Sequence, residues 1–313
     1  MVITRSHSNT RKAWLRMLAV TVVAASSLVP AAMLEQRHFK SEQDAVDALI
    51  DATRSNQTDL LLQILGPDAG KLISSGDPVA DRNGRARFVA AYELAHRIET
   101  EGPDKAVLVV GDEEWPLPIP LVRTGGDWHF DTPTGQQEIL DRRVGRNELG
   151  VLQVCRSYVE AQREYARLQM SLGHGREYAQ HFHSHPGKHD GLYWAVGVGE
   201  PASPLGPLIA QAQAAGYASD GMPRPYYGYY FRILRRQGAH APGGAKDYVI
   251  DGHMTGGFAL LAYPAEYGDS GVMTFMVNDQ GIVFENNLGP KTAEFAAEIQ
   301  QYDPDQSWRI AAD

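Results

Sequence analysis

Cysteine is almost absent from this chain, which has one, Cys155, among 313 residues. A single cysteine cannot form an intramolecular disulfide, even in an oxidising compartment, and the absence of a Cys-x-x-Cys-His string excludes covalent haem attachment. The apolar neighbours of Cys155 follow a helical pattern and no histidine flanks it. We therefore expect a buried structural thiol, with a reactive thiol as the alternative.

Basic side chains are also scarce. The sequence holds 29 Lys and Arg against 38 Asp and Glu, a formal net charge of −9. Because nucleic-acid binding needs a basic surface to offset phosphate charge, this composition argues against a nucleic-acid partner. The 43% share of hydrophobic residues is typical of a globular chain, and the length suits one or two domains.

Long apolar runs are missing except near the N-terminus, where Leu18 to Ala32 is apolar but too short to span a bilayer comfortably. The run ends in Val29-Pro30-Ala31, and basic residues precede it: Arg5, Arg11, Lys12 and Arg16. We interpret residues 1–31 as a signal peptide. An uncleaved segment is the alternative, and would be the one route to a membrane. The sequence thus predicts an exported protein, periplasmic or extracellular.

The first half after this segment reads as helices followed by a small sheet. We expect helices over residues 41–56, 58–65 and 85–99, a loop over 66–84, and strands over 106–110, 117–123 and 128–131. This order makes an α+β domain, assigned to residues 39–133. It looks like a cone-shaped fold of the nuclear-transport-factor-2 type.

The second half, assigned to residues 134–313, reads as a long helix followed by an antiparallel meander. We expect helices over residues 148–170, 204–216 and 292–301. Between residues 220 and 289, short aromatic and β-branched runs alternate with Gly, Pro, Asp and Asn. The predicted fold class is therefore α+β, with N-terminal helices and a small sheet, then a long helix packed on a meander.

Several segments in a fixed order carry a family resemblance. They are Gly111 to Pro120, Trp128 to Asp131, Arg142 to Leu149, Asp190 to Trp194, Ser203 to Pro207, Pro225 to Phe231 and Gly256 to Ala259. With them the chain resembles a bacterial exported-protein family known as domain-of-unknown-function family 2950, which implies export and no particular activity. The long helix before a meander is also similar to the layout of pilins and pseudopilins.

The aromatic run from Pro225 to Phe231 is the strongest binding feature. If it is extended, Tyr227, Tyr229 and Phe231 share one face and Tyr226 and Tyr230 the other. One face would pack on the long helix, and the other would offer a flat platform for sugar rings or peptide. The alternative is plain core packing. The candidate binding residues are Tyr226, Tyr227, Tyr229, Tyr230, Tyr193 and Trp194.

Four histidines form the main candidate metal site: His181, His183, His185 and His189. Alternating histidines on an extended segment would point to one side, as a Zn²⁺ or Cu²⁺ site requires, and Asp190 would add an oxygen ligand. Pro186-Gly187 marks a loop, however, and solvated loop histidines are the alternative.

Two further patterns suggest chemistry. Gly268-Asp269-Ser270-Gly271 is similar to a serine-protease string, but a tight turn explains it better, since no histidine motif accompanies it. Near the domain junction stand carboxylates and arginines: Asp131, Glu138, Asp141, Glu148, Arg142, Arg143 and Arg146. They suit acid–base chemistry or a salt-bridge network, and we favour the network.

The sequence therefore favours a non-enzymatic binding or scaffold module of the cell envelope, with a glycan or an envelope protein as partner and no cofactor. No catalytic residue is nominated. The alternative is an envelope hydrolase, assisted by a metal ion in the histidine-rich loop.

Overall fold

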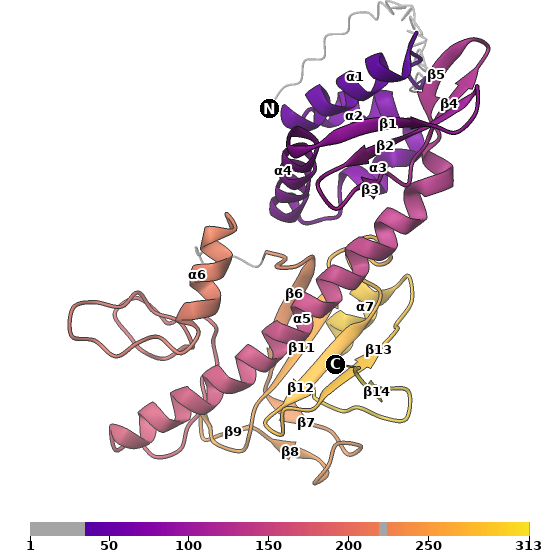
Figure 1. The fold of residues 1–313 in the computed structure, drawn as a ribbon. Helices are drawn as coiled ribbons and strands as arrows, with labels where there is room; N and C mark the ends of the chain where they lie inside the picture. The colour runs from indigo at the N-terminus through magenta and orange to yellow at the C-terminus, as the bar shows by residue number, and fades with distance from the viewer. Residues whose placement is uncertain (1–34, 219–223, 313) are drawn as a thin grey trace, which may run out of the picture. The chain divides into compact units, whose positions relative to one another are not determined.

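The computed structural model describes residues 35–218 and 224–312, so the predicted signal peptide of residues 1–31 lies outside them. Helices and antiparallel strands surround two hydrophobic cores, and the α+β prediction is confirmed (Figure 1). Residues of the first core lie between Phe39 and Phe130, and those of the second between Val151 and Tyr302. Among the described residues, no helix has the length and apolar character needed to cross a membrane.

The first core lies between helices and a five-stranded antiparallel sheet. The helices are α1 (Glu42–Arg54), α2 (Thr58–Leu65), the 3-10 turn η1 (Pro67–Ala69), α3 (Gly70–Ile73) and α4 (Pro78–Leu94). The strands are β1 (His96–Thr100), β2 (Lys105–Val110), β3 (Trp115–Pro116), β4 (Leu121–Thr124) and β5 (Asp127–Phe130), in the order β1-β2-β4-β5 with β3 on β2. The Ser41 side chain accepts the Asp44 N–H and caps α1, as its residue type predicts.

Two expectations for this half are wrong. The segment 66–84 is not a loop, because Asp77 caps a helix that begins at Pro78, and proline suits the first helical turn. That helix also ends sooner, at Leu94, and His96–Thr100 forms β1 instead. The whole of β1 pairs with β2, so sheet hydrogen bonds outweigh the local helical pattern there.

Helix α5 (Thr132–Ser171) begins well before the expected residue 148 and carries side chains of both cores. Near its start it passes close to the segment before β4. A Cβ atom on Gly135 would lie 2.1 Å from the carbonyl oxygen of Pro118, so only glycine fits there. Farther along, α5 buries Val151, Cys155 and Tyr158 against the second core.

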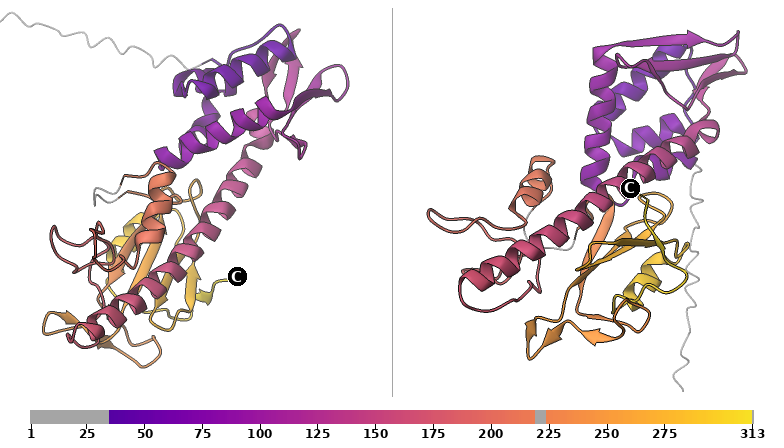
Figure 2. Two further views of the ribbon diagram at one scale, coloured as in Figure 1. Left: turned by 60° about the vertical axis from the view of Figure 1, so that its left-hand side comes forward. Right: turned by 60° about the horizontal axis from the view of Figure 1, so that its bottom comes forward.

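The second core is built on a five-stranded antiparallel sheet in the order β14-β13-β12-β11-β6. The remaining elements are α6 (Gly206–Ala214), β6 (Tyr229–Leu234), β7 (Arg236–Gln237), β8 (Lys246–Asp247), β9 (Val249–Ile250), β10 (His253–Met254), β11 (Ala259–Pro264), β12 (Thr274–Asn278), β13 (Val283–Asn286), α7 (Thr292–Glu298) and β14 (Arg309–Ile310). Strand β11 is almost wholly buried because α5 covers one face of the sheet and α7 the other (Figure 2).

Candidate ligand-binding cavity

A cavity of about 710 Å³ is lined by helices and strands of the N-terminal half, by α5 and by side chains of the C-terminal half: Gln211, Ala215, Tyr217, Tyr226 and Tyr227. Its inner wall is apolar and comes from α1, α2, α4, β2 and the segment after β3: Leu49, Leu61, Phe88, Val110, Leu117 and Ile119. The small side chain of Ala91 also lines the cavity. Pockets of about 300–1,000 Å³ with mainly apolar walls are typical of sites for small molecules.

The mouth of this cavity is polar and carries five arginines from α4 and α5: Arg85, Arg87, Arg142, Arg143 and Arg146. Arg142 pairs with Glu138 and also lies over the Trp115 ring, 5.6 Å from its centroid. The Trp115 ring in turn meets the edge of Phe88 at the start of the apolar wall. Charged and apolar surfaces therefore adjoin in one pocket.

Arg143 and Arg146 are partly withdrawn from water. Desolvation lowers the pKa of both guanidinium groups, and the positive charge of Arg87 lowers that of Arg146 further. Arg143 donates to the carbonyl oxygens of Lys71, at 2.7 Å, and Leu72. The predicted salt-bridge network therefore holds for Arg142 but not for these two side chains. Among the described residues, Arg143 bonds to backbone oxygens, and Arg146 has no hydrogen-bond or ion-pair partner.

Two of the predicted binding tyrosines, Tyr226 and Tyr227, line the mouth. The run is not one extended strand: Tyr226 and Tyr229 exchange backbone hydrogen bonds of 2.8 and 3.1 Å around a tight turn. Tyr227 and Gly228 both have positive φ, 52° and 71°, as a type I′ turn requires. A left-handed tyrosine costs roughly 1 kcal/mol, so the surrounding contacts must hold this turn in place.

Asp77 supplies one of those contacts. Its carboxylate is buried and accepts four hydrogen bonds, from the N–H groups of Val79, Ala80 and Gly228 and from the Tyr217 hydroxyl at 2.7 Å. Burial, and then the Asp77 charge, raise the pKa of Tyr217, which therefore stays a hydroxyl donor. Asp77 thus joins the start of α4 to the tyrosine turn. In the sequence, this role of Asp77 was indicated only by the Asp-Pro pair before a helix.

The other predicted binding residues lie outside the cavity lining. Tyr229 is fully buried and donates to the carbonyl oxygen of Met273 at 2.9 Å, and burial raises its pKa. Tyr230 packs on Tyr263. Tyr193 packs against His183, and the buried Trp194 donates to the carbonyl oxygen of Pro201. The burial of Tyr229 and Trp194 agrees with core packing, the alternative for these residues, and a binding role for Tyr230 and Tyr193 stays a prediction.

The four histidines contact different partners. His181 and His185 lie near each other, with ring centroids 5.2 Å apart, while His189 stacks on Trp194. His185 also pairs with Asp190 at 2.8 Å. Among the residues that the structure describes, no group of three or more His, Cys, Asp or Glu side chains is placed to hold a metal ion. A metal site in this loop stays a prediction.

The Gly-Asp-Ser-Gly string forms a turn. The Ser270 hydroxyl is buried; it donates to the carbonyl oxygen of Glu266 at 3.1 Å and accepts the N–H of the same residue at 2.9 Å. Gly271 is needed because a Cβ there would lie 2.0 Å from the Tyr229 hydroxyl. Glu148 accepts the N–H groups of Val272 and Met273, both at 2.9 Å, so this junction carboxylate orders the strand that follows the turn.

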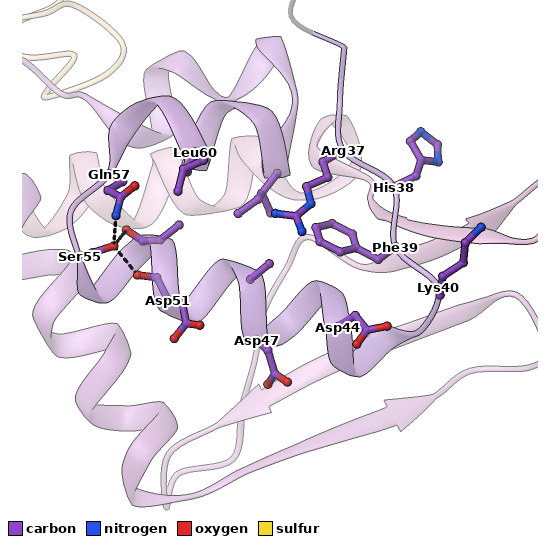
Figure 3. Close-up of a pocket in the computed structure, with 13 residues that line it drawn as sticks. Arg37, His38, Phe39, Lys40, Asp44, Asp47, Asp51, Ser55, Gln57 and Leu60 are labelled. Atoms are coloured by element: carbon purple, nitrogen blue, oxygen red, sulfur yellow. Dashed lines mark hydrogen bonds between the residues drawn. The ribbon is translucent and has the colours of Figure 1, made fainter.

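A second hollow, of about 550 Å³, lies along α1 and α2 beside Arg37 and Phe39 (Figure 3). The carboxylates of Asp47 and Asp51 point away from its Leu60 side in that view. Within it, the Gln57 side chain donates to the Ser55 hydroxyl at 3.1 Å.

Comparison with known protein families identifies a match. A family model with the description "Protein of unknown function (DUF2950)" matches residues 36–311. No curated protein and no solved structure matches the chain. The matched range includes both hydrophobic cores, and the likeness of each half to nuclear transport factor 2 or to pilins stays a prediction.

Proposed function

Because the chain belongs to the DUF2950 family, whose description names no activity, we propose a function from the site itself. The protein is a non-enzymatic binding module, and its N-terminal cavity receives a small molecule with an apolar part. The observation that carries this proposal is the cavity of about 710 Å³ with its apolar wall. A ligand in the cavity would make the packing contacts with this wall that are missing while the cavity is open.

The surroundings of the other candidate groups support a binding role. Ser270 and Glu148 bond to the backbone of their own junction, and the histidines lie in a loop away from the cavity lining. Tyr226 and Tyr227, in contrast, line the mouth on a turn that Asp77 anchors. A glycan or an envelope protein as a further partner stays a prediction for these two tyrosines.

The proposal also places the protein outside the cytoplasm. It rests on the basic residues and the apolar run before Ala32, which lie outside the described residues. Sequencing the N-terminus of the mature protein tests it: an unprocessed Met1 in the protein's native host would contradict cleavage.

Binding of a neutral apolar fluorophore, N-phenyl-1-naphthylamine, tests the cavity. We expect saturable fluorescence with the native protein and at least a tenfold loss of affinity in Ala91→Phe, because the added ring would occupy the cavity. The matched control is Ala90→Phe, one position away on α4, where the side chain is exposed. Equal binding by both variants, or no binding by the parent protein, would overturn the proposal.

A further inference from the structure

The arginines at the cavity mouth are not fully explained by the protein's own contacts. Arg142 has Glu138, and Arg85 donates to the Asn56 side chain and to the carbonyl oxygen of Ile73. Among the described residues, no carboxylate forms an ion pair with Arg87, Arg143 or Arg146. Three guanidinium groups therefore face one opening without an opposite charge bonded to them.

These three groups lie close enough to repel one another. Arg146 experiences the charge of Arg87, and Arg143 experiences that of Arg146. Holding like charges together while removing water from them costs free energy, which an anion between them would offset. The guanidinium group also matches the planar oxygen pair of a carboxylate and the oxygens of a phosphate, which it binds through two parallel hydrogen bonds.

The carboxylates near this mouth offset part of the charge of Arg143 but not that of Arg146. The charges of Asp81 and Asp269 raise the pKa of Arg143, whereas burial and the charge of Arg87 both lower the pKa of Arg146. Asp81 itself accepts the Ser75 hydroxyl at 2.7 Å and the Ser75 N–H at 3.0 Å. Asp112 and Glu113 are exposed on the turn after β2. The concentration of arginines is also local, since the whole chain has a formal charge of −9.

From this arrangement we infer that the ligand is an amphiphile with an acidic head, a carboxylate or a phosphate, on an apolar chain. Arg87, Arg143 and Arg146 bind the head, and the chain lies along Phe88 and Leu117 in the apolar wall. This inference rests on the proposed function and narrows it. A neutral apolar molecule would leave the guanidinium groups of Arg87 and Arg146 without partners, and a cationic one would be repelled.

The test is displacement of N-phenyl-1-naphthylamine by three molecules of equal chain length: dodecanoate, dodecyl phosphate and dodecanol. The two acids are used below their critical micelle concentrations and dodecanol below its solubility limit. We expect one or both acids to bind at least tenfold more tightly than dodecanol. Arg146→Gln and Arg87→Gln should remove most of that preference while leaving dodecanol unchanged. Neither side chain makes a hydrogen bond or ion pair among the described residues, so the variants should fold.

Two further variants sharpen the result. Arg146→Lys should retain part of the preference, because it keeps the charge but loses the forked geometry. Arg97→Gln is the control, since Arg97 pairs with Glu99 and Glu114 and does not line the cavity. Tighter binding of dodecanoate would identify a carboxylate head, and tighter binding of dodecyl phosphate would identify a phosphate head. Either result supports the inference.

The outcomes separate this inference from the proposed function. Equal binding of all three molecules, unchanged in Arg146→Gln, would overturn the acidic head while leaving an apolar cavity in place. Failure of the fluorophore to bind the parent protein would instead remove the cavity proposal and the inference with it.

Discussion

Gly150 shows how a single position links the long helix to the cavity. Glycine in the middle of a helix usually costs about 0.5–1 kcal/mol relative to alanine, so its presence in α5 needs a reason. The reason is the Tyr227 ring: a Cβ on Gly150 would lie 2.7 Å from it. The left-handed turn at Tyr227 and the missing side chain at Gly150 therefore depend on each other.

Gly150→Ala should lower the free energy of unfolding by about 1–3 kcal/mol, because overpacking against a fixed ring outweighs the gain in helix propensity. The matched control is Gly145→Ala on the same helix, where a Cβ meets nothing within 4 Å. That variant should gain about 0.5–1 kcal/mol. Urea titration measures both, and stabilisation by both substitutions would contradict the contact with Tyr227.

Among the elements, the segment after α7 shows how short pieces of backbone are held in place. Tyr302 pairs with Gln237 in β7, and the Gly238 N–H donates to the carbonyl oxygen of Tyr302 at 2.9 Å. Asp303 accepts the His240 N–H at 2.7 Å and lies 3.0 Å from the Nδ1 of the same imidazole. A hydrogen-bonded pair that titrates thus joins the segment to the strand β7.

This pair should make stability depend on pH. The hydrogen bond to Asp303 raises the pKa of His240. The contribution of His240 to folding stability is therefore complete below about pH 6.5 and is lost as the pH rises through the pKa of the folded state. Partial burial opposes a low pKa for Asp303, but the hydrogen bonds from His240 outweigh it and lower that pKa. The contribution of Asp303 to folding stability is therefore complete above pH 3.8 and is lost as the pH falls through the pKa of Asp303 in the folded state.

His240→Gln should accordingly cost more stability near pH 5 than at about pH 8.5, measured by urea unfolding at each pH. The control is the same substitution in an Asp303→Asn background, where the difference between the two pH values should vanish. A cost that does not change with pH would show that the pair contributes no titrating interaction.

At the scale of the whole molecule, the described residues belong to one compact unit although they contain two cores. Several contacts join the halves: Asp77 accepts the Gly228 N–H, Arg143 donates to the carbonyl oxygens of Lys71 and Leu72, and Lys71 pairs with Asp269 at 3.1 Å. Helix α5 also enters both cores. These links should make the two halves unfold together.

Cys155 reports on this coupling because it is fully buried in the second core, where burial raises the pKa of its thiol to about 12. Gly135→Ala forces a Cβ against the Pro118 carbonyl in the first half and should lower the urea concentration at which a thiol reagent labels Cys155. Gly145→Ala is the control. Unchanged labelling of Cys155, with an earlier loss of tryptophan fluorescence from the first half, would show that the halves unfold separately.

The sequence by itself determined the α+β class, the positions of α1 and α2, the strands of the meander and the buried thiol, because apolar periodicity and caps are local signals. It also pointed to Tyr226 and Tyr227. It did not predict β1, the early start of α5 or the cavity. The polar first turns of α5 carry little apolar periodicity, and β1 depends on pairing with β2.

Only the tertiary structure decided which neighbours share the candidate site. Arg87 and Arg146 are far apart in the chain, and nothing in their local sequence shows that α4 and α5 bring both to one opening. Tyr229 and Tyr227 look alike in the sequence, yet one is buried and the other lines the mouth. The physical reason is the turn at Gly228: a positive φ reverses the chain there, and only contacts with distant residues such as Asp77 and Gly150 stabilise that reversal.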